Sequence, residues 1–318
     1  MPCHVHLLQD FDDGWIKEFS TCLDSSITIT TDPDVSSTAN ILISGSPEAK
    51  HLEASKILTT LVIPWAGLPK ATRVLMKDYP HIAIYNIHHN AAVVAEHAVA
   101  MMMASARNLI PTDKIFRTND WSPRYDKTSI FQLKGKTALI LGHGAIGKQI
   151  AKICRTLGMK VAGLKRDFDM AEGTYSTAEL PAFLPKTNVL FICLPLTPET
   201  LGMIGKKELS LLPDNAIIVN IGRGAVIQEE ALYSELKSGR LRAGLDVWYQ
   251  YPKKEKIWSV YPPSKFDFAS LENVIMTPHL AGHSDLVEED RIAQLAELIN
   301  NLASGKKPKT KIDINRGY

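Results

Sequence analysis

The stretch Leu139–Arg166 constrains the fold more than any other part of this chain. It reads LILGHGAIGKQIAKICRTLGMKVAGLKR, with Gly142, Gly144 and Gly147 in G-x-G-x-x-G spacing. The first glycine permits a tight turn out of a strand, the second lets the backbone approach a pyrophosphate, and the third lets helix and strand pack closely. An ordinary strand–helix turn is the alternative interpretation. We expect a strand, a helix and a second strand around the motif, which together predict a dinucleotide-binding unit; they are Thr137–Leu141, Ile146–Leu157 and Lys160–Leu164.

The end of the second strand indicates which dinucleotide binds. An NAD-binding unit usually carries Asp or Glu there to bind the ribose 2′-hydroxyl. This chain has Lys165 and Arg166 instead, whose positive charges would attract a 2′-phosphate. We therefore predict NADP(H) as the preferred cofactor. Asp167 keeps NAD(H) open as a second possibility, and a solvated basic loop is the alternative without a cofactor role.

Length and composition restrict the class of protein. A chain of 318 residues suits two domains, and 45% hydrophobic with 22% charged residues is typical of a globular protein. The net charge of +2 and the lack of a basic tract argue against a nucleic-acid partner. No apolar stretch approaches the roughly 20 residues that span a bilayer, so we expect no membrane association. Acidic Asp10, Asp12 and Asp13 occupy the place of a signal peptide's apolar core.

The cysteines favour a reducing compartment. The chain has four, and none is in a C-x-x-C pair: Cys3, Cys22, Cys154 and Cys193. We interpret them as reduced thiols of a cytoplasmic protein, not as a disulfide framework or a metal site.

The first part of the chain alternates short apolar strands with helices, which predicts a parallel sheet covered by helices. A buried, methionine-rich helix is expected at Ala91–Leu109, followed by an irregular stretch from Pro111 to Gln132. The expected strands are Val5–Leu8, Ile41–Ser44, Leu61–Ile63 and Ile82–Tyr85.

The second part predicts a six-stranded, doubly wound nucleotide-binding sheet. The amphipathic last helix, Leu286–Ala303, follows this unit and is expected to return to the first domain. The fold class is therefore α/β, with two doubly wound parallel-sheet domains. The expected strands are Thr137–Leu141, Lys160–Leu164, Val189–Cys193, Ala216–Asn220, Ala243–Val247 and Val274–Met276.

Three polar side chains follow strands at the carboxyl edge of this sheet, where ligands bind in such folds. Arg223 lies in NIGRG, and its guanidinium suits a carboxylate; a surface arginine paired with an acid is the alternative. His279 lies in TPHLAG and is a candidate general acid, with a structural histidine as the alternative. Asp246 ends another strand at the same edge. The remaining histidines, such as His88 and His89, have no metal-ligand spacing, so we predict no metal site.

The order of these motifs resembles the D-isomer-specific 2-hydroxyacid dehydrogenase family. The resemblance implies a Rossmann cofactor domain, residues 107–286, inserted into a flavodoxin-like substrate domain, residues 1–106 and 287–318. It also implies a homodimer and a small 2-keto or 2-hydroxy acid as substrate. The matching segments are GHGAIG, LPLTPETLG at Leu194–Gly202, NIGRGAVIQEEAL at Asn220–Leu232, AGLDVW at Ala243–Trp248, TPHLAG at Thr277–Gly282 and VVAEHAVAMMMASAR at Val93–Arg107.

The resemblance also implies roles for residues at matching positions. Arg223 would clamp the substrate carboxylate, and His279 would protonate the carbonyl oxygen as hydride arrives. Asp246 would hold the nicotinamide amide. Backbone N–H groups of the loop Trp65, Ala66 and Gly67 would also bind the carboxylate. The further cofactor contacts implied are Gly142, Gly144, Ala145, Ile146, Gly147, Lys165, Arg166, Leu194, Pro195, Thr200, Ile221, Gly222 and Gly282, with Arg223 and His279 beside them.

One position departs from the family pattern. Family members usually place a Glu five residues after the aspartate of the LDV motif, where it raises the pKa of the catalytic histidine. This chain has Tyr251 there, beside Gln250. We hypothesise that Tyr251 belongs to the catalytic group, and that His279 titrates near its unperturbed pKa of about 6.5. Reduction would then decline above neutral pH earlier than in a relative with the Glu. One alternative is that Glu255 reaches back to the histidine from the loop. Another is that Tyr251 only lines the pocket and a different acid serves.

These inferences predict an NADP(H)-dependent reductase of a short 2-keto acid resembling glyoxylate or hydroxypyruvate, with a D-2-hydroxy acid as product. The missing Glu and Gln250 keep a formate- or phosphite-type dehydrogenase as an alternative. A second alternative is a dinucleotide-gated binding protein like the C-terminal-binding-protein corepressors of the same superfamily.

Overall fold

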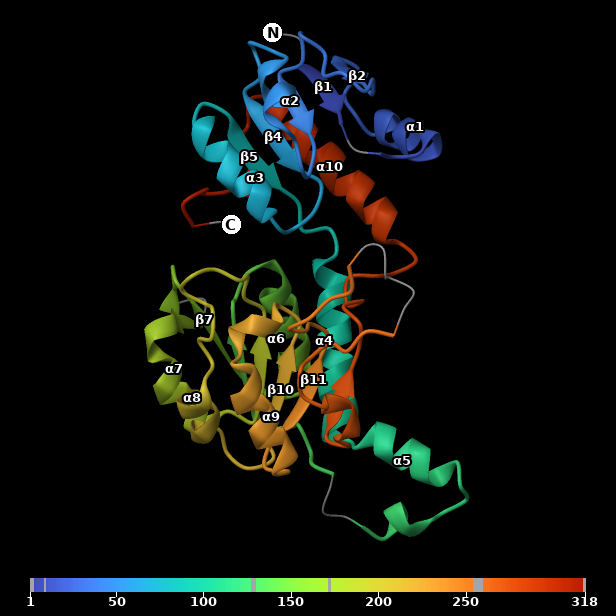
Figure 1. Cartoon of the computed structure of the whole chain (residues 1–318), viewed down its shortest axis with the longest axis vertical. Helices are drawn as coiled ribbons and strands as arrows, with labels where there is room; N and C mark the ends of the chain where they lie inside the picture. The colour runs from blue at the N-terminus through green and yellow to red at the C-terminus, as the bar shows by residue number, and fades with distance from the viewer. Residues whose placement is uncertain (1–2, 9, 127–129, 171–172, 254–259, 317–318) are drawn as a thin grey trace. The chain divides into compact units, whose positions relative to one another are not determined.

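The chain folds into two compact units, each built on one parallel sheet (Figure 1). The structure is a computed structural model that describes residues 3–8, 10–126, 130–170, 173–253 and 260–316. The first unit combines Met1–Asn90 with Ser284–Tyr318, and the second is Ala91–His283. The second unit is therefore inserted into the first.

The first unit has a five-stranded sheet in the order β2-β1-β3-β4-β5, which is the flavodoxin-like order. Its neighbouring strands pair in parallel. The strands are β1 (Cys3–Leu7), β2 (Ile27–Thr30), β3 (Ile41–Ile43), β4 (Thr60–Ile63) and β5 (Ala83–Asn86). The helices are α1 (Asp13–Thr21), α2 (Ala49–Glu53), α3 (Lys70–Leu75), α10 (Val287–Ala303) and the 3₁₀ turn η1 (Met76–Asp78).

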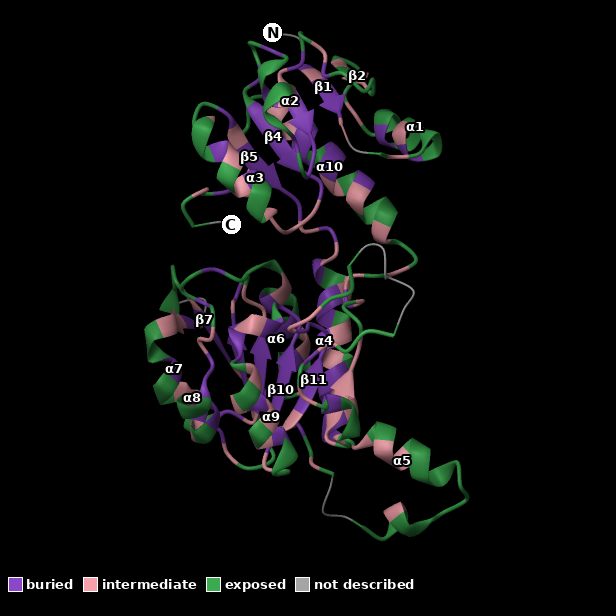
Figure 2. Cartoon of the chain, viewed as in Figure 1, coloured by how far each residue is buried: buried purple, intermediate pink, exposed green. Residues whose placement is uncertain are grey.

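Both faces of this sheet are buried, because successive side chains of a strand point to opposite faces. In β3, Ile41 and Ile43 belong to the core that contains Leu295 of α10. Leu42 lies between them in sequence and packs with Leu52 of α2 in a separate core. The central strands β3 and β4 are accordingly purple in Figure 2. The last helix thus packs on the first sheet, as expected from its position after the nucleotide-type unit.

The second unit has a seven-stranded parallel sheet in the order β12-β11-β10-β9-β6-β7-β8. The strands are β6 (Thr137–Leu141), β7 (Lys160–Lys165), β8 (Thr174–Ser176), β9 (Val189–Ile192), β10 (Ile217–Asn220), β11 (Arg242–Leu245) and β12 (Val274–Met276). The α-helices are α4 (Ala91–Ala106), α5 (Leu109–Phe116), α6 (Ala145–Thr156), α7 (Leu180–Phe183), α8 (Lys206–Leu211) and α9 (Glu229–Lys237). The 3₁₀ turns are η2 (Ser122–Arg124), η4 (Thr177–Glu179), η5 (Leu184–Lys186), η6 (Gly224–Val226) and η8 (Phe268–Ser270).

The expected count of six strands was wrong, because β8 adds a seventh at the edge next to β7. Its sequence is Thr-Tyr-Ser, too short and too polar to stand out as an apolar run. The chain reverses its winding direction between β6 and β9, which both pair with neighbours at the centre of the sheet. Doubly wound sheets bind ligands at the carboxyl ends of the strands at this switch point.

Helix α4 lies in the second unit, whereas the expected substrate domain extended to residue 106. Its Ala95, Ala98 and Met102 are fully buried in the core that also contains Phe191 of β9. The helix approaches β11 so closely that a Cβ on Gly244 would lie 2.7 Å from Cβ of Met101. Small residues therefore bring α4 onto the nucleotide-type sheet, and the observed division falls before α4, not after it.

The stretch that follows α4 is more regular than expected. Between Pro111 and Gln132 we anticipated irregular chain, but α5 begins at Leu109 and continues to Phe116. Pro111 occupies the first turn of this helix, where a missing N–H breaks no helical hydrogen bond. In Figure 1, α5 extends away from the seven-stranded sheet of its own unit.

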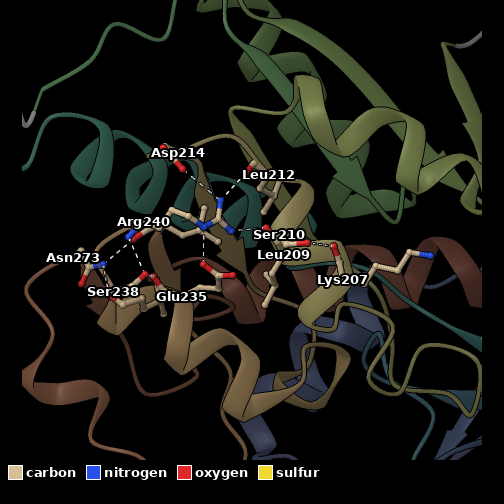
Figure 3. Close-up of polar contacts among 11 residues, drawn as sticks. Lys207, Leu209, Ser210, Leu212, Asp214, Glu235, Ser238, Arg240 and Asn273 are labelled. Carbon is tan, nitrogen blue, oxygen red and sulfur yellow. Dashed lines mark hydrogen bonds and ion pairs between the residues drawn. The ribbon is translucent and has the colours of Figure 1, made fainter.

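A network centred on Arg240 ties the loops at the amino edge of this sheet (Figure 3). Its Nε donates to Glu235 Oε2 at 2.7 Å, and its Nη1 and Nη2 donate to the carbonyl oxygens of Leu212 and Leu209, also at 2.7 Å. One guanidinium therefore joins the end of α8 to α9.

Among the described residues, no helix has the length and apolar character needed to cross a bilayer.

Candidate active site

The glycine-rich turn connects β6 to α6 at the carboxyl edge of the sheet. Gly142 has φ +100°, and a Cβ there would lie 2.9 Å from the backbone of Cys193. A Cβ on Gly147 would lie 2.2 Å from the Gly142 oxygen, so helix and turn touch at this point. A Cβ on Gly144, by contrast, would meet no atom within 4 Å. Two glycines thus serve packing, and the third faces open space.

Helix α6 presents its amino end to that space. Gly144 is its N-cap residue, and the first backbone bond of the helix runs from Lys148 N to Gly144 O at 2.9 Å. The N–H groups of Ala145, Ile146 and Gly147 precede this bond and have no acceptor within the helix. Such groups, with the positive end of the helix dipole, bind phosphate. The turn therefore fits the pyrophosphate of a dinucleotide.

The basic pair lies at the end of β7, as the sequence predicted. Lys165 is the last residue of the strand, and Arg166 follows it. Nη2 of Arg166 lies 3.9 Å from Oε2 of Glu199, which belongs to the loop after β9. The side chains of Arg166 and Glu199 are 38% and 65% exposed, so solvent screens this ion pair and it is weak. A phosphate group near Arg166 would compete with Glu199 for the guanidinium.

Two further loops at this edge are held by their own side chains. Oγ1 of Thr200 donates to Pro195 O at 2.7 Å and accepts from Thr197 N at 2.8 Å, which fixes the loop after β9. In the loop after β10, Asn220 accepts from Gly222 N and donates to Arg223 O, both at 3.1 Å. The segments that contain Leu194 and Ile221 thereby have defined backbones at the carboxyl edge.

Gly222 and Gly224 flank Arg223 and let its loop pack closely. A Cβ on Gly222 would lie 2.6 Å from Leu194 O, and one on Gly224 would lie 2.4 Å from Trp248 O. Arg223 itself is exposed, and its Nη1 donates to Gly222 O at 2.7 Å. The rest of its planar fork is open to solvent, which suits bidentate binding of a carboxylate.

His279 is held in an uncommon backbone conformation. Its φ is +57°, in the left-handed region that non-glycine residues rarely adopt. The buried Asp246 carboxylate fixes the residues that follow: Oδ1 accepts from Leu280 N at 2.9 Å, and Oδ2 accepts from Ala281 N at 3.0 Å. Oδ1 also accepts from Thr277 Oγ1 at 2.6 Å. Asp246 is therefore the anchor of the turn that presents His279.

The surroundings of His279 favour its neutral form. The residue reaches solvent, but partial burial of the imidazole lowers its pKa below the usual value. The positive charge of Arg223 lowers the pKa further, and His283 acts in the same direction. Asp246 opposes these effects and raises the pKa. Arg223 and His279 are thus close enough to interact electrostatically, as the motif positions predicted.

Tyr251 contacts the candidate acid. Its ring centroid lies 5.6 Å from that of His279, at an angle of 57°. The phenol oxygen accepts a hydrogen bond from Trp248 N at 3.0 Å. Burial raises the pKa of Tyr251, so the phenol is neutral near pH 7. The structure therefore places a neutral aromatic group beside the imidazole. Glu255, the other expected partner, lies outside the described residues.

The loop of Trp65, Ala66 and Gly67 belongs to the first unit and follows β4. Asn86 Nδ2 donates to Ala66 O at 2.6 Å, which ties the loop to the end of β5. The indole of Trp65 fills the space beside Gly45, where a Cβ would lie 1.9 Å from the ring. The expected substrate-binding role of this loop stays a prediction.

Sequence reasoning missed two residues of this site, His97 and Thr277. His97 Nε2 lies 3.1 Å from Thr277 Oγ1 and 3.8 Å from Asp246 Oδ1. Thr277 was within a quoted motif, and His97 is an isolated imidazole in an apolar helix, so both had a visible signal. In the part of the chain that the structure describes, no group of three or more His, Cys, Asp or Glu side chains is placed to hold a metal ion.

A family model matches more than half of this chain. Residues 99–281 match the family model for the D-isomer specific 2-hydroxyacid dehydrogenase, NAD binding domain. The chain is 34% identical over 231 residues to the glycerate dehydrogenase of Methylorubrum extorquens, covering 71% of this chain and 70% of that enzyme. For longer curated relatives the matched region covers as little as 41% of their length.

Two solved structures share the whole fold. The D-isomer specific 2-hydroxyacid dehydrogenase of Xanthobacter autotrophicus, solved with NADPH and MES, superposes with a TM-score of 0.80 and 22% identity over 100% of both chains. The NADPH-dependent glyoxylate/hydroxypyruvate reductase of Sinorhizobium meliloti, solved with NADP and sulfate, has a TM-score of 0.78 and 22% identity, covering 99% of this chain and 100% of the other.

Proposed function

Because this chain belongs to the D-isomer-specific 2-hydroxyacid dehydrogenase family, we propose that it reduces a short 2-keto acid to the D-2-hydroxy acid with NADPH. Glyoxylate and hydroxypyruvate are the proposed substrates, in line with the names of the Methylorubrum and Sinorhizobium relatives. The observation that carries the proposal is the placement of Arg223 after β10 and His279 after β12, at the same carboxyl edge of the sheet and within electrostatic range of each other. An exposed cation beside an imidazole suits a substrate with a carboxylate next to a ketone.

The proposed mechanism divides the work between two side chains. Arg223 binds the substrate carboxylate through its fork and thereby orients the ketone. His279, in its protonated form, donates a proton to the carbonyl oxygen as negative charge develops there. Tyr251 packs against the imidazole and limits its orientations. The bound nicotinamide supplies the hydride.

The choice of NADP(H) is supported by the two cations at the end of β7, Lys165 and Arg166. A 2′-phosphate would gain two charge-assisted contacts there, whereas a ribose 2′-hydroxyl would gain none of comparable strength. Gly144 leaves room for the pyrophosphate at the amino end of α6. NAD(H) remains the second candidate cofactor, since Asp167 follows the basic pair.

We also propose that the protein is a homodimer that uses α5 and the segment after it. Exposed apolar side chains are concentrated there, including two on α5 that are more than half exposed. Such a surface is typical of a protein–protein interface. The side chains are Leu109 (53% exposed), Ile110 (58%), Phe116 (49%), Trp121 (59%) and Tyr125 (78%).

The proposed location is the cytoplasm, where thiols stay reduced. Cys3, Cys22, Cys154 and Cys193 are all free. Burial raises the pKa of Cys154 to about 12, so its thiolate is not populated at neutral pH.

The test is a panel of 2-keto acids with NADPH or NADH, followed by cofactor absorbance. We expect the highest kcat/KM with NADPH and a two- or three-carbon keto acid. His279→Ala should lower kcat by about 10²- to 10⁴-fold. His81→Ala, at an exposed position before β5, is the matched control and should keep wild-type rates. Turnover by His279→Ala at the wild-type rate would contradict the proposal.

The neutral Tyr251 beside His279 favours one second candidate, a formate- or phosphite-type dehydrogenase. A dehydrogenase of that kind needs no protonated imidazole, because hydride would pass from the small anion to NAD(P)⁺ and no carbonyl oxygen has to be protonated. Incubating the protein with NADP⁺ or NAD⁺ and formate or phosphite separates the candidates. Tight NADPH binding with no turnover of any of these substrates would instead indicate a binding protein.

A further inference from the structure

The buried Asp246 carboxylate fixes the turn that contains His279 by accepting hydrogen bonds from it. It is 1% exposed and accepts three hydrogen bonds, two of them from the backbone N–H groups of Leu280 and Ala281. These peptide groups directly follow His279, whose φ of +57° is costly for a residue with a side chain. The hydrogen bonds from the turn to Asp246 offset this strain. The direction of the imidazole thus depends on where Asp246 sits.

The third donor to Asp246 is Thr277, and the geometry of this group also defines the role of His97. The Thr277 hydroxyl has one proton, which its 2.6 Å bond to Asp246 Oδ1 uses. Toward His97 the hydroxyl can therefore only accept. His97 Nε2, at 3.1 Å, must carry the proton and donate it. The result is a chain of hydrogen bonds from α4 to the turn, here called the relay: His97 donates to Thr277, Thr277 donates to Asp246, and Asp246 accepts from the backbone N–H groups that follow His279.

The charged groups around His279 show that Asp246, within this relay, supplies a negative charge to the imidazole. Arg223, from the loop after β10, and His283, from the turn that contains His279, both disfavour the imidazolium. Tyr251, from the loop after β11, is a neutral phenol whose oxygen accepts from Trp248 N. Nε2 of His97, from α4, lies 3.8 Å from Asp246 Oδ1. Asp246 is the anion that favours the imidazolium.

We propose that His97 and Thr277 are positioning residues for His279: through Asp246 they hold the turn that presents the imidazole, and Asp246 supplies the negative charge that the chain lacks at position 251. The role of His279 as an acid comes from the proposed function, but the relay itself does not depend on it.

The first experiment separates positioning from binding. Thr277→Val keeps the size of the side chain but removes the hydroxyl that links His97 to Asp246. We expect kcat to fall about 10- to 100-fold, as is typical when a supporting hydrogen bond is lost, while KM for NADPH stays within about twofold. Thr277→Ser should recover most of kcat. Thr156→Val, on the exposed face of α6, is the matched control.

The second experiment uses His97, where the hydrogen bond to Thr277 can be kept or removed. His97→Gln keeps an N–H donor for Thr277, whereas His97→Leu removes the donor. We expect His97→Gln to retain kcat within about threefold and His97→Leu to lose about tenfold. These two His97 variants test the positioning role even if Thr277→Val fails to fold. Equal rates in the two variants would overturn the proposal.

The third experiment needs no turnover. The His279 imidazole is titrated by NMR in the free protein, its signal being assigned by its loss in His279→Gln. We expect Asp246→Asn to move the His279 midpoint to lower pH, because the favourable charge is gone while Arg223 remains. An unchanged or higher midpoint in folded Asp246→Asn would overturn the proposal. A lower midpoint in a protein that reduces no 2-keto acid would support the relay and reject the proposed function.

Discussion

The two edges of the seven-stranded sheet each have a prominent arginine, and the two arginines are used differently. At the amino edge, Arg240 donates to Glu235, Leu209 and Leu212 and lies 3.7 Å from Asp214 (Figure 3). At the carboxyl edge, Arg223 donates to the neighbouring Gly222 oxygen and is otherwise exposed.

The difference lies in the partners that the fold supplies. A guanidinium has five N–H donors, and one whose donors are engaged by the protein has little capacity for a ligand. Arg240 stabilises the junction of α8 and α9 in this way. Among the described residues, no carboxylate lies within ion-pairing distance of Arg223, so its fork is available to a carboxylate from outside. The same side chain is structural at one edge and ready for a ligand at the other.

The largest effect should come from Arg223. Replacing it by Gln removes a charge-assisted, bidentate contact, so we expect kcat/KM for the keto acid to fall about 10²- to 10⁴-fold with little change in thermal stability. Steady-state kinetics and a melting curve measure both quantities. A variant that melts well below the wild type would show that Arg223 is structural after all, and the contrast with Arg240 would disappear.

Two glycines of the β6–α6 turn show the same contrast between a structural role and a ligand-binding role, here within one edge of the sheet. Gly147→Ala would push a Cβ to within 2.2 Å of Gly142 O, and we expect a loss of about 1 to 3 kcal/mol in unfolding free energy. Gly144→Ala meets no atom within 4 Å and has φ −88°, so stability should be unchanged while the Kd for NADPH rises at least tenfold. Denaturant unfolding and fluorescence titration test the pair. Equal NADPH affinity in Gly144→Ala and the wild type would mean that the turn does not hold the pyrophosphate.

Arg240→Gln is the counterpart at the amino edge. It leaves the carbonyl oxygens of Leu209 and Leu212 with weaker donors, and we expect about 2 kcal/mol of destabilisation with kcat/KM within twofold of the wild type. Arg155→Gln, at an exposed position on α6, is the control and should change the unfolding free energy by less than about 0.5 kcal/mol. A strong loss of activity in folded Arg240→Gln would link the two edges functionally.

The dependence of the rate on pH tests the electrostatics of the carboxyl edge. Burial and Arg223 lower the pKa of His279, and the acid must be protonated to donate. Reductive kcat/KM should therefore be highest at acidic pH and decline as pH rises through a value below about 6.5. Oxidation of the hydroxy acid uses the neutral imidazole, so its rate should rise over the same range. Reductive profiles that stay flat to alkaline pH would require a different acid.

The smallest effect should come from Glu199. Since it lies 3.9 Å from Arg166 in an exposed ion pair, Glu199→Gln should lower the Kd for NADPH only about two- to fivefold, without affecting NADH. Arg166→Gln should act in the opposite direction on NADPH. Parallel titrations with both cofactors give the ratio of the two Kd values. Identical changes for NADPH and NADH would show that Arg166 does not bind the 2′-phosphate.

Much of the fold was predictable because apolar strands and glycine turns are local signals. The predicted strands Thr137–Leu141 and Val274–Met276 agree with β6 and β12 at both ends. Strands without such a signal were missed. Ile27–Thr30 alternates Ile with Thr and is not buried, and β8 is three residues of Thr, Tyr and Ser. Both become strands only because a neighbouring strand offers its backbone.

The candidate site was predictable to the same extent. Motif positions placed Arg223 and His279 together, because the carboxyl ends of parallel strands meet at one edge. Tyr251 was identified through the family resemblance. The partners of these residues were not predictable. Nothing in the order of residues indicates that Asp246 accepts from the turn after His279, or that His97 reaches Thr277 across 180 residues of sequence.

The amino-acid sequence alone determined the class of fold, the dinucleotide turn and the family, since each depends on spacing within a short segment. The tertiary structure decided which groups are already engaged: Arg240 but not Arg223, and Asp246 by three donors of its own chain. The physical reason is that a hydrogen bond depends on distance in space, and residues far apart in the chain acquire that distance only when the sheet and its helices pack.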